Sequence, residues 1–121
     1  MSDCVFCGRI GRGEYDYDDK YSVAFRPLHP VTPGHFLVIP RKHVASAFDS
    51  PLHASRAACL AAELARIMEL ESFNLITSTG AAATQTVMHQ HWHVVPRTEG
   101  DGLALPWTGQ AEREGRSPHA D

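Results

Sequence analysis

Three histidines at every second position place the strongest constraint on how this chain can fold. They are His89, His91 and His93, inside the segment TQTVMHQHWHVVPR. Because side chains alternate across a β-strand, residues two apart share a face, with neighbours roughly 7 Å apart. We therefore expect residues 87–95 to form a strand that ends at Pro96 and carries the three imidazoles on one face. The opposite face would carry apolar side chains, those of Trp92 and Val94.

The other apolar patterns predict a small α+β domain. Alternation over residues 21–25 predicts a half-buried strand, and the turn signal Pro33-Gly34 leads into the apolar run HFLVIP, which is typical of a central strand. Ser50-Pro51 can cap and open a helix, which apolar residues at three- and four-residue spacing continue to about residue 70. Another strand is expected over residues 73–79. Together these elements predict an antiparallel meander with one long helix and a short N-terminal helix.

Length and charge exclude several classes of protein. A chain of 121 residues suits one domain, and a net charge of −3 offers no basic stripe for nucleic acid. No apolar stretch approaches the ~20 residues that span a bilayer, and the N-terminus lacks the cationic start of a signal peptide. We expect a cytoplasmic protein with no nucleic-acid or membrane partner. Its domain would cover residues 1–109, followed by a polar tail, residues 110–121, that has little to bury.

The histidine run favours chemistry over packing, because burying three imidazoles costs more than burying Val or Ile. A metal could use His-x-His, but catalytic metal sites often add a carboxylate, and residues 72–98 contain no Asp or Glu. An imidazole that attacks phosphorus needs such acid-free surroundings, because carboxylates repel an anionic substrate. Hydroxyl, amide and backbone donors precede the run at Ser78, Thr79, Gly80, Thr84, Gln85 and Thr86. These features favour phosphorus chemistry, with a triad-bound catalytic metal as the rival.

Three motifs in order resemble the histidine triad (HIT) family: CVFC, PVTPGHFLVIPRKHV and TQTVMHQHWHVVPR, over residues 4–107. The resemblance implies a HIT-like α+β fold and a homodimer whose sheet continues across the interface. It also implies a hydrolase or transferase that cleaves a nucleoside phosphoramidate or dinucleoside polyphosphate through a nucleotidyl-histidine intermediate. The substrate would be a purine nucleotide or a related small molecule. The alternative is a catalytically weak nucleotide-binding regulator or adaptor.

The resemblance also assigns roles to individual residues. His91 would be the nucleophile, with Nδ1–H held by an acceptor so that the Nε2 lone pair faces the α-phosphorus. Trp107 matches a tryptophan near the active site of some members, although it could equally belong to the core. The substrate-binding residues would be His35, Ser78, Gln85, Thr86 and His93.

Three departures from the family pattern concern substrate recognition. Many members have Asn at the position of Ser78, and relatives often have at Pro27 an Asp that accepts hydrogen bonds from the ribose hydroxyls. Thr84 replaces a common glycine. Because proline offers no side-chain acceptor, we expect phosphate chemistry to be retained and nucleoside discrimination to be weak.

The Cys4-x-x-Cys7 pair supplies half of a tetrahedral zinc site. Spacing alone cannot choose two further ligands among eight histidines. The resemblance implies that His43 and His89 complete a closed, structural zinc site, with no catalytic metal, in which case His89 cannot be the nucleophile. The alternative is two free thiols at a helix start. Cys59, on the apolar side of the long helix, is expected in the core.

Overall fold

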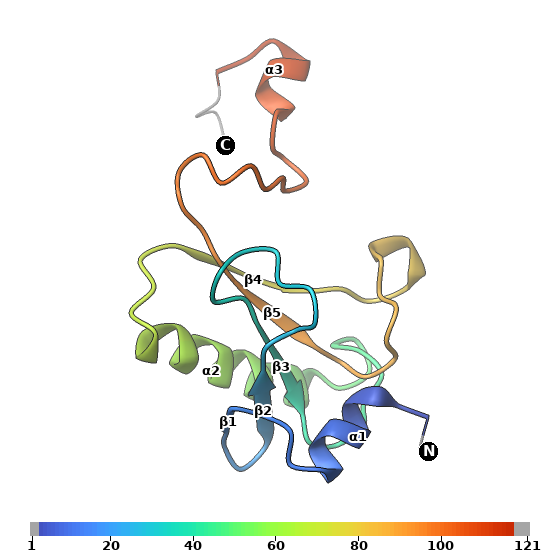
Figure 1. Cartoon of the computed structure of the whole chain (residues 1–121). Helices are drawn as coiled ribbons and strands as arrows, with labels where there is room; N and C mark the ends of the chain where they lie inside the picture. The colour runs from blue at the N-terminus through green and yellow to red at the C-terminus, as the bar shows by residue number, and fades with distance from the viewer. Residues whose placement is uncertain (1–2, 118–121) are drawn as a thin grey trace.

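Five antiparallel strands form one sheet in the computed structural model, which describes residues 3–117 (Figure 1). The strands run in the spatial order β1-β2-β3-β5-β4. The prediction of a central HFLVIP strand is confirmed, because β3 lies in the middle. Strands β1 to β3 are successive neighbours, whereas β5 inserts between β3 and β4, so the predicted meander holds for the first half only. The strands are β1 (Tyr17–Asp18), β2 (Ser22–Phe25), β3 (Phe36–Pro40), β4 (Phe73–Thr77) and β5 (Trp92–Pro96).

The long helix α2 (Pro51–Ile67) covers one face of the sheet, as predicted. Ser50 caps it by accepting a hydrogen bond from the backbone N–H of His53 at 3.3 Å. It ends before residue 70 because Glu69 adopts a left-handed φ of 56°, and Leu70 N–H bonds back to the Ala65 carbonyl. Its buried face and the sheet share one core cluster: Ala24, Phe36, Val38, Ala57, Leu60, Ala61, Leu64 and Val94.

The short helix α1 (Val5–Gly11) lies against the opposite face of the sheet. Phe6 packs there with Phe25 and Leu37. The rings of Phe6 and Phe25 meet edge-to-face, with their centroids 5.6 Å apart. Strand β2 is consequently buried along its whole length. The expectation of a half-buried strand at residues 21–25 was wrong, because a second layer covers the face that alternation assigned to solvent.

Strand β5 begins at Trp92, later than the predicted residue 87. The preceding backbone turns away from β4 toward the loop after β3, where Gln90 N–H donates to the Val44 carbonyl at 2.7 Å. Of the three histidines only His93 therefore lies within the strand. Trp92 and Val94 do face α2, as expected from alternation.

The chain beyond β5 contains α3 (Gln110–Glu114), in the polar tail that was expected to have little to bury. Its side chains are not buried, so this five-residue helix is held by local bonds such as Gln110 to Glu114 at 3.0 Å. Figure 1 shows it beyond β5, away from the sheet. The domain boundary at residue 109 stays a prediction, and the end of the proposed tail, residues 118–121, lies outside the described residues.

Cys59 differs from its expected place, and one of the two alternatives for Trp107 is excluded. Cys59 is exposed on α2 and does not join the core, and Trp107 is 62% exposed in the loop before α3, so it is not a core residue. Among the described residues, no helix is long and apolar enough to cross a bilayer.

Candidate active site and metal site

His91 is held so that one ring nitrogen is free. Its Nδ1 lies 2.8 Å from the carbonyl oxygen of His89. Because a carbonyl only accepts, Nδ1 must carry a proton, and in the neutral ring the lone pair is then on Nε2. Within residues 3–117, Ser22 Oγ is the sole buried side-chain N or O atom without a hydrogen-bond partner. In the described part of the chain Nε2 of His91 has no hydrogen-bond partner, so it keeps some access to solvent.

His93 and His35 form a second imidazole pair beside His91. His93 Nδ1 and His35 Nε2 are 2.9 Å apart, and the ring centroids of His91 and His93 are 5.4 Å apart. Burial lowers the pKa of His35. Burial, with smaller effects of His91 and His35, lowers the pKa of His93 to about 4. Both rings are therefore neutral at pH 7.

The predicted phosphate-binding residues are only partly brought together. Ser78 lines a cavity of about 280 Å³ with His35, His93 and Thr84. Thr86 is exposed in the loop before His89. Gln85 is buried, and its side chain bonds to backbone: it accepts from Gly80 N–H at 2.9 Å and donates to Ala45 O and Val87 O at 2.6 and 3.0 Å. In this arrangement Gln85 shapes the loop, and its contact with substrate stays a prediction.

The backbone of that loop is strained at Thr84. Its φ of 69° is left-handed, a conformation that favours glycine and is rare for a β-branched residue. Thr84, which departs from the glycine common in the family, thus adopts a conformation that glycine takes more easily.

A larger cavity of about 420 Å³ lies between α1 and β2. Phe6 lines this cavity and also contacts His91, with their ring centroids 5.3 Å apart, so the cavity lies next to the triad. The floor is apolar and the rim carries arginines, an arrangement that suits a flat organic group attached to an anion. Apart from Pro27, the lining residues named below were not predicted from the sequence, and the spacing of Phe6 and Arg9 on one helix face was the available signal. The lining includes Val5, Phe6, Arg9, Arg12, Phe25, Arg26, Pro27, Leu28 and Leu37.

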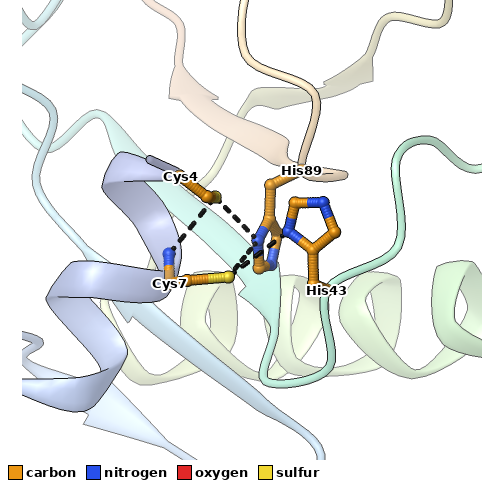
Figure 2. A group of neighbouring side chains, drawn as sticks. All are labelled: Cys4, Cys7, His43 and His89. Atoms are coloured by element: carbon orange, nitrogen blue, oxygen red, sulfur yellow. Dashed lines mark hydrogen bonds between the residues drawn. The ribbon is translucent and has the colours of Figure 1, made fainter. Parts of the chain in front are cut away.

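Cys4, Cys7, His43 and His89 converge from three segments (Figure 2). Their candidate ligand atoms all lie within 4.8 Å of one another. Cys4 Sγ is 3.4 Å from His89 Nδ1, and Cys7 Sγ is 3.3 Å from His43 Nδ1. Zinc bonded tetrahedrally to sulfur and nitrogen at ~2.3 and ~2.0 Å would separate those atoms by about 3.5 Å. This group could therefore hold a metal ion with little rearrangement.

The surroundings of His89 suit a metal ligand. Its Nε2 lies 2.8 Å from the carbonyl oxygen of Pro40, so Nε2–H donates and the Nδ1 lone pair faces the thiols. The same atom therefore cannot attack a substrate bound elsewhere. Burial, and then the hydrogen bond with Cys4, raise the pKa of the Cys7 thiol.

Comparison with known proteins gives consistent matches. The family model described as "HIT domain" matches residues 14–100. The chain is 36% identical to "Adenosine 5'-monophosphoramidase HNT1" of Saccharomyces cerevisiae, over 88% of this chain and 71% of that protein. It is 33% identical to "Adenylylsulfatase HINT3" of Arabidopsis thaliana, over 93% of this chain and only 60% of that longer protein. A solved HIT family protein from Bacillus anthracis superposes with a TM-score of 0.77 at 32% identity, covering 93% of this chain and 86% of the other.

Proposed function

This chain belongs to the HIT family, and from that premise we propose that it cleaves a nucleoside phosphoramidate or a dinucleoside polyphosphate through a nucleotidyl-histidine intermediate. The family membership and the HIT-like α+β fold expected from the sequence are both confirmed. The general class, a nucleotide-binding hydrolase, is also supported by relatives named as a phosphoramidase and an adenylylsulfatase.

His91 is the proposed nucleophile, and the observation that carries this is its hydrogen bond to the His89 carbonyl. The Nε2 lone pair attacks the α-phosphorus, a P–N bond to the ring forms, and the bond to the leaving group breaks. The leaving group departs with the electron pair and takes a proton from the surroundings. Water then attacks the same phosphorus, and the P–N bond breaks with its electron pair returning to Nε2. The proton that the water loses replaces the one taken up by the leaving group, the nucleotide is released, and the ring regains its neutral Nδ1–H form.

The substrate would span the two cavities. The α1–β2 cavity, with its apolar floor, takes the nucleoside. Phe6 lines this cavity and also contacts the ring of His91, so the attached phosphorus would lie toward His91. His93 adjoins His91, with ring centroids 5.4 Å apart, and lines the second cavity together with His35 and Ser78. We assign substrate-binding roles to His35, Ser78, Gln85, Thr86 and His93, with Thr86 reaching the phosphate from the exposed loop.

We also propose that Cys4, Cys7, His43 and His89 bind a structural zinc ion. The chemistry of the donors, two thiols and two imidazoles, and the sulfur–nitrogen distances suit this metal. Four protein ligands would leave no open position for substrate, so the ion would hold α1 against the segment that carries the triad. The reaction itself then rests on His91.

The deciding experiment incubates the protein with adenosine 5'-phosphoramidate. We expect wild type to release AMP and to form a transient adduct on the His91 peptide, detectable by mass spectrometry after rapid quenching. His91→Ala and His91→Gly should lose at least ~10³-fold in kcat/KM. His29→Ala, at an exposed histidine outside both cavities, is the matched control and should retain activity.

The outcomes separate the rival functions. Tight AMP binding without turnover by wild type would support the regulator or adaptor. Loss of activity on chelation, with the fold intact by circular dichroism and the adduct absent, would support a catalytic metal on the triad. Either result would overturn the proposed mechanism.

A further inference from the structure

A backbone amide contacts the imidazole of His35 from outside the triad. The N–H of Val31 lies 3.1 Å from His35 Nδ1. A backbone N–H can only donate, so Nδ1 must be the acceptor and carry the lone pair. In a neutral imidazole the proton is then on Nε2. Burial keeps the His35 ring neutral by lowering its pKa.

The same logic passes to the next ring. His35 Nε2 is 2.9 Å from His93 Nδ1, and one of these two nitrogens must donate. Because Nε2 of His35 carries the proton, it donates the hydrogen bond, and Nδ1 of His93 accepts that bond with its lone pair. The opposite direction would place a proton on His35 Nδ1, directly facing the Val31 N–H. His93 is therefore left with its own proton on Nε2.

We propose that the Val31 amide sets the tautomer of His93 through His35, so that His93 presents Nε2–H to a bound phosphoryl oxygen while His91 presents a bare Nε2. Besides lining the substrate cavity, His35 is then a positioning residue that acts through His93. Within residues 3–117 no protein group accepts a hydrogen bond from Nε2 of His93. Nε2 is also not one of the fully buried polar atoms that lack a partner, so it keeps some access to solvent. Its proton is thus available to a ligand. The assignment of the phosphoryl oxygen rests on the proposed function, whereas the tautomers do not.

The two triad rings are set by opposite backbone groups. A carbonyl, that of His89, holds the proton of His91 on Nδ1. An amide, that of Val31, holds the proton of His93 on Nε2. One ring can attack phosphorus, and its neighbour can donate to the negative charge that builds on oxygen as the attack proceeds.

The loop that carries the Val31 amide is fixed to the sheet. Thr32 Oγ1 donates to the Pro96 carbonyl at 3.1 Å, at the end of the strand that contains His93. His35 N–H bonds to the Thr32 carbonyl at 3.2 Å. The donor and the two rings therefore belong to one hydrogen-bonded unit, which is why a loop amide can control a strand side chain.

The first test is long-range ¹H–¹⁵N NMR of histidine-labelled protein at pH 7. We expect lone-pair nitrogen signals at Nδ1 of His35, at Nδ1 of His93 and at Nε2 of His91. A lone-pair signal at Nε2 of His93 would overturn the proposal. This readout needs no substrate, so it holds whether or not the protein turns over a phosphoramidate.

Variants test the direction of control. Val31→Pro removes the N–H, and Val31→Ala is its matched control because it keeps the amide. We expect mixed tautomers at His35 and His93 in the proline variant and the wild-type pattern in the alanine variant. His35→Phe, which keeps a ring but no donor, provides a second route if the proline variant does not fold. It should also mix the tautomers of His93, and unchanged tautomers in His35→Phe would refute the proposal.

Activity gives an independent readout. His35→Phe should lower kcat by about 10-fold with a smaller change in KM, the size expected for one weakened hydrogen bond to a charged group. A loss confined to KM would contradict a role in positioning the donor. If wild type has no turnover but shows the expected tautomers, the proposed function fails and the tautomer assignment remains.

Discussion

Identical side chains in one run carry different chemistry because different backbone groups hold them. His89 donates from Nε2 to Pro40, which directs Nδ1 to the thiols, whereas His91 donates from Nδ1 and keeps Nε2 free. The sequence could predict that the middle histidine needs an acceptor, because neutral imidazole has a single N–H. It could not identify the acceptor as the carbonyl of His89, since that depends on the bend that precedes β5.

The buried pair His35 and His93 should make stability depend on pH. The pKa of His93 falls from an ordinary 6.5 to about 4, chiefly through burial, and that of His35 shifts in the same direction. Between pH 6.5 and about 4, His93 therefore binds a proton in the unfolded chain but not in the folded chain. The free energy of unfolding then falls as the pH falls. We expect urea titrations to show a steeper fall for wild type than for His93→Gln. Parallel curves for the two proteins would contradict the assignment.

At the scale of elements, local signals predicted what local contacts determine. Ser50 and Pro51 marked the start of α2 to the residue, because the cap bond forms between neighbours. The start of β5 was predicted too early, because His89 is drawn to Cys4 and Cys7 from the other end of the chain. Burial on both faces of β2 was missed for the same reason, since it depends on where α1 packs.

Helix α1 should depend on the metal. Its two cysteines contact His43 and His89, and its Phe6 forms part of the wall next to His91. We expect purified protein to contain about one zinc per chain, and Cys4→Ser to lose most of it, because a closed site needs all four ligands. A metal present at 100 times its Kd contributes about 2.7 kcal/mol to stability, so chelation should lower the thermal midpoint.

Cys59→Ser is the matched control for zinc binding, because this exposed cysteine lies on α2, outside the cluster. It should retain wild-type zinc and thermal stability. Less than about half a zinc per chain in gently prepared wild type, measured by atomic emission, would refute the proposed site.

The turn before β3 requires glycine at residue 34. Gly34 has a φ of 86°, and a Cβ there would lie 3.1 Å from Met68 Cε and 3.3 Å from Pro96 Cγ. Gly34→Ala should cost roughly 1–2 kcal/mol for the left-handed backbone and ~1 kcal/mol or more for the crowding. Gly100→Ala is the control, because its φ is 72° and its Cβ would meet nothing within 4 Å. Equal losses in urea unfolding of the two variants would show that crowding contributes nothing.

At the scale of the whole molecule, the site depends on segments from both ends of the chain. The N-terminal helix supplies the cysteines and Phe6, the β2–β3 loop supplies Val31 and His35, and the segment around β5 supplies the triad. The sequence alone does not show that these separate segments meet in space. The family resemblance could predict the group of four ligands, since it carries over which histidines accompany the cysteine pair.

The two edges of the sheet differ in how well they resist pairing with another chain. Edge strand β1 is two residues long and is flanked by Asp16 and Asp19. Edge strand β4 has five residues, and its Phe73 and Ile76 are each 36% exposed. Short, charged edges discourage strand addition, whereas long apolar edges permit it. If the protein forms a homodimer with a continuous sheet, as its family resemblance implies, β4 is the edge that would pair.

Charge placed on β4 should therefore separate the subunits. We expect wild type to sediment at twice the chain mass of 13.3 kDa in analytical ultracentrifugation, and Ile76→Lys at the mass of one chain. A lysine in the middle of a paired edge must lose its hydration or displace the partner strand, so the dimer becomes the less stable state. Tyr17→Lys puts the same charge on β1 and should leave the dimer intact. A monomeric wild type would refute the dimer, and dissociation by Tyr17→Lys alone would move the interface to the opposite edge.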